Sequence, residues 1–184
     1  NGAPVSIRSP KDAFQLGIGM IHQHFKLIPV FTAAENIILG EQGGKYDLRA
    51  AEQKLSELAD RYGFRLNPKQ KVYELSVSEK QTVEIMKVLY RGADILILDE
   101  PTAVLTPQET ERLFAILRKM REDGKSILII THKLNEVLAI SDRVAVLRKG
   151  QYIGEVETAK ADASLLTEMM VGEKVKLGIE RAEP

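Results

Sequence analysis

Four apolar residues followed by two acids and a proline, at positions 95–101, constrain the fold of this chain more than any other stretch. The unbroken Ile-Leu-Ile-Leu run indicates a strand that is covered on both faces, as in a parallel sheet. Asp99 and Glu100 stand at the carboxyl end of this strand, where open α/β sheets bind their ligands. Pro101 predicts an extended backbone for Glu100, so the two carboxylates should point in different directions. If one carboxylate binds a metal ion and the other binds a water molecule, the pair would suit nucleotide hydrolysis. The alternative is that the two acids form a turn without a catalytic role.

Charge and cysteine content exclude several kinds of site and partner. The chain has 184 residues, enough for one domain or for one domain with a subdomain. Lys plus Arg equals Asp plus Glu at 26 each, so no excess charge indicates nucleic acid or an anionic membrane as a partner. The lack of cysteine excludes disulfides and thiolate metal ligands and is compatible with a reducing compartment.

Strand patterns alternate with helix patterns from residue 94 onward, which is typical of a parallel sheet with crossover helices. The elements predicted there are strands at 94–99, 126–131, 143–148 and 151–157, and helices at 107–121, 133–140 and 162–171. The chain before residue 94 has predicted strands at 5–7 and 18–21 and predicted helices at 10–17, 47–62 and 76–90. Its segment from 24 to 90 is mainly helical. The predicted class is α/β, a mainly parallel core with an inserted α-helical subdomain.

A second motif, Leu-Ser-Val-Ser-Glu-Lys-Gln at 75–81, precedes the acidic strand by one helix. Ser76 and Glu79 have the spacing of a capping box, which predicts a helix end with available N–H groups. Such an end can bind an anion, and phosphate would suit it, whereas a simple helix cap is the alternative. His132 follows the predicted strand at 126–131, so it should lie at the same edge of the sheet as the two acids.

Together these motifs resemble the nucleotide-binding domain of ABC transporters, a branch of the P-loop NTPases. Gln23 matches the Q-loop glutamine of that family, residues 75–81 its signature, residues 95–101 its Walker B strand, and His132 its switch histidine. Residues 103–106 occupy the position of its D-loop. The resemblance covers residues 1 to about 172 and is closest to sugar- and nucleoside-import ATPases in the stretches MIHQHFKLIP, ENIILGE, KVLYRGADILILDEPTAVLTPQE and THKLNEV.

The resemblance implies roles for individual residues. Glu100 would be the general base, His132 would contact the γ-phosphate, and Gln23 would join the shell of Mg²⁺ and water. Asp99 would hold Mg²⁺, with Gln23 as a second metal-side residue. The residues implied to contact ATP, which the opposite subunit holds, are those of the signature: Leu75, Ser76, Val77, Ser78, Glu79 and Gln81.

The same resemblance implies partners and a location. ATP and Mg²⁺ would be the cofactors, and ATP would lie in a head-to-tail dimer with a second nucleotide-binding domain. Transmembrane permease subunits would be direct partners and a solute-binding protein an indirect one, at the cytoplasmic face of the membrane, with no role for nucleic acid. The alternatives are a soluble ABC-type ATPase without coupling to transport and a non-hydrolysing interaction module. The short spacing from Gln23 to Leu75 leaves no room for the long coiled coil of DNA-repair members.

One departure from the family is the absence of a Gly-x-x-x-x-Gly-Lys-[Ser/Thr] phosphate loop (Walker A) from the 184 residues. Gly43 and Gly44 before Lys45 predict a plain turn instead. The chain is therefore interpreted as a fragment of the first of two fused domains, inactive by itself. The predicted parts are a remnant of the core at 1–22, the Q-loop and helical subdomain at 23–90, the RecA-like core at 91–158, and a helix and tail at 159–184.

The signature also departs from the family pattern. Ser78 stands where glycine is usual and adds a Cβ close to the expected phosphate, and Glu79 adds negative charge where glutamine is usual. We hypothesise that the composite ATP site completed by this signature is weaker than its partner site.

Overall fold

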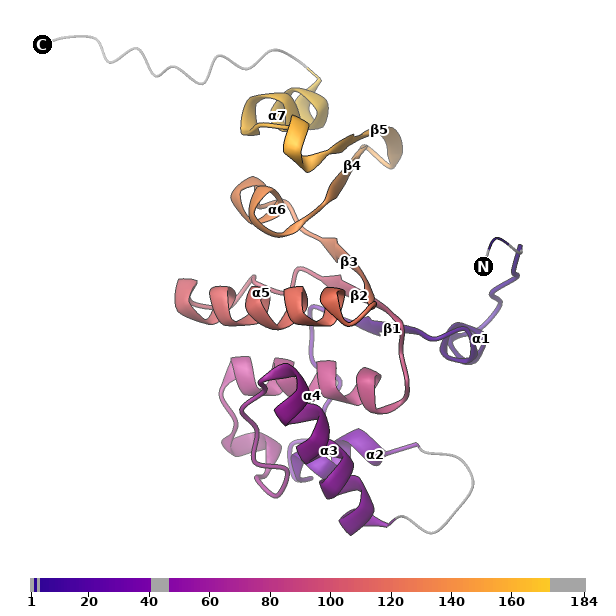
Figure 1. The fold of residues 1–184 in the computed structure, drawn as a ribbon, viewed down its shortest axis with the longest axis vertical. Helices are drawn as coiled ribbons and strands as arrows, with labels where there is room; N and C mark the ends of the chain where they lie inside the picture. Colours follow the sequence, from indigo (N-terminus) through magenta and orange to yellow (C-terminus); the bar gives the residue numbers. More distant parts are fainter. Residues whose placement is uncertain (1, 3, 41–46, 173–184) are drawn as a thin grey trace, which may run out of the picture. The chain divides into compact units, whose positions relative to one another are not determined.

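The computed structural model describes residues 2, 4–40 and 47–172, and the chain divides into two compact units, residues 1–130 and 131–184. The elements of the first unit are α1 (Pro10–Gln15), β1 (Ile18–Ile21), α2 (Ala33–Ile38), α3 (Leu48–Tyr62), a 3₁₀ turn (Val72–Glu74), α4 (Val77–Tyr90), β2 (Ile95–Asp99), α5 (Pro107–Glu122) and β3 (Ser126–Ile130) (Figure 1).

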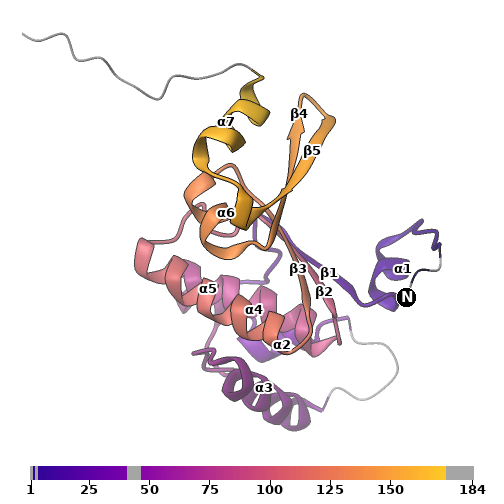
Figure 2. The same cartoon turned by 45° about the horizontal axis from the view of Figure 1, so that its top comes forward.

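A three-stranded parallel sheet in the order β1-β2-β3 forms the centre of the first unit, as Figure 2 shows. Ile18 pairs with Ile95, and Ile95 pairs with Ser126. The central strand buries Leu96 and Leu98 completely. Helix α4 packs against β1, and α5 packs against β3. The strand predicted from the apolar run at 95–98 is therefore confirmed as a parallel strand with a neighbour on each side.

Helices α2, α3 and α4 pack against one another and form the helical part of the first unit. Val83, Met86 and Leu89 of α4 are buried, as predicted from their spacing. The sequence did not predict α2 as a separate helix. Five of its six residues are buried, so its sequence lacks the alternation of apolar and polar faces that marks a helix.

The second unit consists of α6 (Leu134–Ile140), β4 (Arg143–Arg148), β5 (Gln151–Glu157), a 3₁₀ turn (Thr158–Lys160) and α7 (Ala163–Val171). Strands β4 and β5 form an antiparallel hairpin, and α7 packs against β4. Lys149 and Gly150 connect the strands with φ of 51° and 77°, which suits a two-residue turn of type I′. The predicted edge strand at 151–157 is confirmed.

The predicted strand at 5–7 is wrong, because these residues form no regular element. Val5 and Ile7 are 62% and 50% exposed, so no packing surface supports a strand there. The predicted turn at Gly43 and Gly44 lies outside the described residues, and so does the tail from residue 173. The four-part division of the chain stays a prediction. Across the part of the chain that the structure describes, no helix is long and apolar enough to cross a bilayer.

Candidate functional site

The strands β1, β2 and β3 end at one edge of the sheet, and three predicted site residues lie there. The register pairs the last residue of β1 with Leu98 and the last residue of β3 with Asp99. Gln23 follows two residues after β1, and Glu100 follows directly after β2. Asp99 and Glu100 are both half-buried. The structure therefore brings Gln23, Asp99 and Glu100 to the same end of neighbouring strands.

The backbone of Glu100 is not extended, so that prediction is wrong. Its φ is 47°, in the left-handed region. The Glu100 N–H donates to the Ile130 carbonyl at 2.9 Å, and the Glu100 carbonyl accepts from the Ala103 N–H at 3.2 Å. Pro101 disfavours a right-handed helical conformation for Glu100, and these two hydrogen bonds select a left-handed turn instead. A non-glycine residue in this region is strained, and such strain is concentrated at functional sites.

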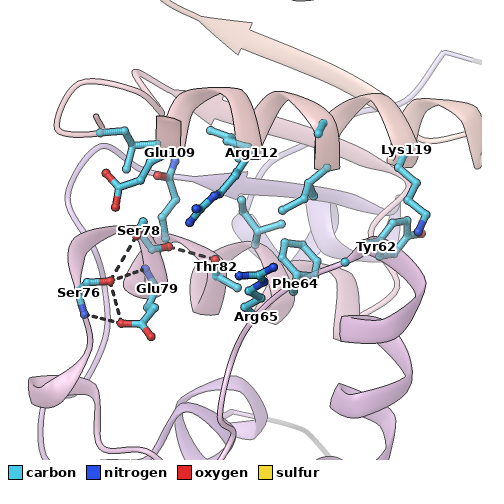
Figure 3. Close-up of a pocket in the computed structure, with 17 residues that line it drawn as sticks. Tyr62, Phe64, Arg65, Ser76, Ser78, Glu79, Thr82, Glu109, Arg112 and Lys119 are labelled. Atoms are coloured by element: carbon cyan, nitrogen blue, oxygen red, sulfur yellow. Dashed lines mark hydrogen bonds between the residues drawn. The ribbon is translucent and has the colours of Figure 1, made fainter. Parts of the chain in front are cut away.

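Ser76 caps helix α4 as predicted, and Glu79 completes the capping box. The Ser76 Oγ accepts from the Glu79 N–H at 3.3 Å, while a Glu79 carboxylate oxygen accepts from the Ser76 N–H at 2.8 Å and from its hydroxyl at 2.7 Å (Figure 3). The hydroxyl oxygens of Ser76 and Ser78 are 3.3 Å apart. Leu75 is buried, whereas Val77 is 41% exposed. The nucleotide contacts of these residues stay predictions.

One side chain of α4 connects this helix to the segment that follows the acids. The buried Gln81 donates from its amide nitrogen to the Pro101 carbonyl at 2.7 Å. Ser78 of α4 and Glu109 in the first turn of α5 line the same cavity. Hydrogen bonds from the Thr106 N–H, and then from the Ser78 and Thr106 hydroxyls, lower the pKa of the Glu109 carboxyl. The hydrogen bond from Gln81 therefore joins α4 to the segment that follows the acids, which the sequence did not predict.

Glu84 is a functional candidate that sequence reasoning missed. It lies on the buried side of α4 with 7% of its surface exposed, and it accepts the Lys26 N–H at 2.7 Å. Lys26 follows three residues after Gln23, so the Q-loop segment is bonded to the helix that begins with the signature. A carboxylate within an otherwise apolar stretch, Val83-Glu84-Ile85, is the sequence signal that could have indicated it.

Asn36 fixes the next part of the same segment. Its side-chain oxygen accepts the Ile28 N–H at 2.7 Å, and its amide nitrogen donates to the carbonyls of Ile28 and Thr32 at 3.0 and 3.1 Å. Asn36 is 1% exposed, so its polar groups depend on these partners. The stretch after Gln23 is thus held by side chains of both α2 and α4.

His132 follows β3 by two residues and belongs to the second unit. Asp99 and Glu100 belong to the first unit, so the approach of His132 to them stays a prediction.

The residues predicted to bind the metal ion carry oxygen atoms that can act as ligands. Asp99 offers a carboxylate and Gln23 an amide oxygen at the same edge, and within the described ranges no group of three His, Cys, Asp or Glu residues could hold a metal ion. Mg²⁺ in nucleotide sites is bound by one or two carboxylates together with water and phosphate oxygens. This donor set fits Mg²⁺ that arrives with a nucleotide.

Comparisons with known proteins agree with this geometry. The family model described as "ABC transporter" matches residues 1–103. The nucleoside import ATP-binding protein NupA of Lactococcus lactis subsp. cremoris (strain MG1363) is 49% identical over 180 residues, which cover 96% of this chain and 36% of that protein. The guanosine import ATP-binding protein NupO of Bacillus subtilis (strain 168) is 48% identical over 183 residues, with coverage of 98% and 36%.

Solved structures show the same fold. An ATP-binding cassette of an ABC transporter in its ADP conformation has a TM-score of 0.73 at 24% identity, over 90% of this chain and 72% of that one. A nucleotide-free ATP-binding cassette has a TM-score of 0.69 at 24% identity, with coverage of 82% and 64%. The chain spans about a third of the length of the curated relatives, 36% of NupA and of NupO. From the family model and these relatives together, the chain belongs to the ABC transporter family of ATP-binding domains.

Proposed function

We propose that the polypeptide containing this chain binds and hydrolyses ATP to energise an importer of sugars or nucleosides. The observation that carries the proposal is that Gln23, Asp99 and Glu100 lie at one sheet edge, where Gln81 of α4 hydrogen-bonds to the next residue, Pro101. The relatives named for nucleoside and guanosine import support the class of solute. The relative named as a glucose import ATP-binding protein in Haloferax volcanii, 44% identical over 212 residues, supports sugars as the other class.

Catalysis by these residues consists mainly of positioning and charge stabilisation. Glu100 accepts a proton from the attacking water, and the strained turn fixes the direction of its carboxylate. Asp99 and Gln23 provide oxygens for Mg²⁺, which supplies charge neutralisation on the phosphates when bound. His132 would contact the γ-phosphate.

The signature residues act on a second nucleotide. Ser76 and the N–H groups at the start of α4 face the γ-phosphate of ATP held by a second nucleotide-binding domain in a head-to-tail dimer. Leu75, Val77, Ser78, Glu79 and Gln81 complete or support that contact. ATP binding and hydrolysis in this dimer drive a movement of the permease subunits that cross the membrane. A solute-binding protein delivers the solute to these subunits. The ATPase lies at the cytoplasmic face of the membrane.

The test uses the complete polypeptide with its permease subunits and the substitution Glu100→Gln. Removing a general base slows hydrolysis by about 100-fold or more, while ATP binding persists because the amide keeps the shape of the side chain. Glu111→Gln, on the exposed side of α5, is the matched control and leaves the rate unchanged.

An unchanged rate in Glu100→Gln would exclude this role for the acid. A soluble ATPase would lose hydrolysis in the same variant but would show no stimulation by a solute-binding protein. An interaction module would show no hydrolysis in either form.

A further inference from the structure

A cavity of about 680 Å³ lies within the first unit, beside the residues assigned above. Its walls are the turn after α3 at residues 62–65, the first turns of α4, and one side of α5 (Figure 3). Ser76 and Glu79 lie at one end of the cavity, and Tyr62 and Lys119 lie at the other. The cavity therefore extends from the signature to a region for which the proposed ATPase cycle has no use.

Cationic side chains enter this cavity from opposite walls. Arg65 comes from the turn after α3, and Arg112 and Lys119 come from α5. Figure 3 shows the guanidinium groups of Arg65 and Arg112 reaching into the same part of the cavity. Among the described residues, no ion pair within 4.0 Å involves any of these three cations. Like charges that face one another this way favour an anion between them.

The nearby carboxylates form hydrogen bonds or ion pairs with other groups. Glu79 accepts from the backbone and the hydroxyl of Ser76, and Glu109 accepts from Thr106 and Ser78. Glu109 also interacts with Arg112 electrostatically, although this is the weakest of the influences on its pKa. Asp123 binds Arg61 and the Tyr62 hydroxyl. The positive charge of Arg65, Arg112 and Lys119 is therefore not balanced by these acids.

Apolar side chains line the cavity beside these cations. Phe64 and Leu113 are 7% and 6% exposed, and Ile116 is half-buried. Tyr62 meets Phe64 edge to face, with ring centroids 6.2 Å apart. A flat apolar group can be covered by this surface while its charged end reaches the guanidinium groups.

We propose that this cavity binds a small organic anion, with a phosphate, sulfonate or carboxylate group between Arg65 and Arg112 and an apolar body against Phe64 and Ile116. Arginine suits this task because its planar fork makes paired hydrogen bonds to such groups. In Figure 3 Arg65 and Arg112 lie between the two ends of the cavity, whereas Ser76 lies at one end, so the site is next to the predicted nucleotide contact and does not include Ser76.

Phenyl phosphate is the probe for this site, titrated calorimetrically into the complete polypeptide without nucleotide. We expect a dissociation constant of about 1 mM or lower, and weaker binding of inorganic phosphate, which lacks the apolar body. The double variant Arg65→Gln/Arg112→Gln should weaken phenyl phosphate binding at least about tenfold. Arg49→Gln, an exposed arginine of α3 outside the cavity, is the matched control and should bind as the parent does.

The variant Arg65→Lys/Arg112→Lys distinguishes the paired hydrogen bonds from charge alone. This variant keeps both positive charges but lacks the planar guanidinium groups. Its affinity for phenyl phosphate should therefore fall between those of the parent and the double glutamine variant. Thermal melting of each variant confirms that it is folded. The proposal is overturned by the absence of phenyl phosphate binding at about 10 mM, by equal affinity of the parent and the double glutamine variant, or by an equal loss in Arg49→Gln. Because no nucleotide is present, these outcomes are independent of the ATPase proposal.

Discussion

Glu100 shows how the place of a residue in the fold can be predicted while its backbone geometry is missed. Its acid character and its position after an apolar strand follow from the sequence alone. Its left-handed backbone depends on a hydrogen bond to Ile130, which is distant in sequence and comes from a neighbouring strand. A local rule, such as the effect of Pro101 on the residue before it, cannot predict that hydrogen bond.

Gly19 is predicted to be intolerant of any side chain. A Cβ at this position would lie 2.8 Å from the Val88 Cβ and 3.2 Å from the Ala93 Cβ, so β1 and α4 would have to separate. Gly19→Ala should lower the free energy of unfolding by about 1–3 kcal/mol. Gly154→Ala is the control, because its Cβ would meet only the flexible end of Met169 at 3.5 Å. Urea denaturation compares the two, and equal small losses would contradict the close approach.

Ser78→Gly tests the hypothesis of a weaker composite ATP site. The substitution removes a Cβ near the expected phosphate, so ATP hydrolysis by the complete transporter should rise. Ser56→Gly, on the exposed face of α3, controls for the cost of glycine in a helix. The steady-state ATPase rate is the measurement, and an unchanged rate in Ser78→Gly argues against the hypothesis.

At the scale of elements, the strands and long helices could be predicted because their signals are local. The helix starts at Ser76 and Thr106 follow from capping boxes, and both boxes are formed. Helix α2 could not be predicted as a distinct element, because it is covered on nearly all sides. The bonds that join elements, such as Gln81 to Pro101, depend on packing that no single segment encodes.

Glu84 should hold the Q-loop segment to α4. Glu84→Leu removes the charged acceptor of the Lys26 N–H, at a cost of about 1–3 kcal/mol in unfolding free energy. Glu84→Gln retains an oxygen acceptor and should cost less. Hydrogen exchange of the Lys26 amide should accelerate in the leucine variant and stay slower in the glutamine variant. Equal exchange in both variants and the parent would show that the bond does not order this segment.

Tyr62 joins α3 to the end of α5 and makes the stability of the first unit sensitive to alkaline pH. Burial, followed by the hydrogen bond to Asp123, raises the pKa of Tyr62 to about 12. Because this pKa lies above the ordinary value of 10.0, the contribution is complete below pH 10 and is lost as the pH rises toward 12.

Tyr62→Phe has no phenol to ionise, so its stability should fall less than that of the parent between pH 10 and 12. Tyr73→Phe is the control, since Tyr73 is 62% exposed. Thermal melting across this pH range is the measurement. Parallel pH profiles for the parent and Tyr62→Phe would contradict the assignment.

At the scale of the whole molecule, the edge strand β3 exposes Leu128 and Ile130 at 55% and 47%. A strand edge with apolar side chains is a template for pairing with another chain. We predict that the 184-residue chain alone self-associates, and that Leu128→Lys reduces association without altering the buried core. Sedimentation velocity over a range of concentrations measures this. A concentration-independent monomer with cooperative melting would contradict it.

The parallel register of the sheet also sets an order of events during synthesis. Strand β1 pairs with β2, whose residues are made only after the whole helical segment between them, and β2 in turn pairs with β3. Helix α4 can therefore form before β1 has a neighbouring strand, and the contact of Gly19 with Val88 can hold β1 in place until β2 emerges. Non-local pairing of this kind slows folding. On the growing chain, the strand ends that carry Gln23 and Asp99 can meet only after the whole helical segment between them has been made.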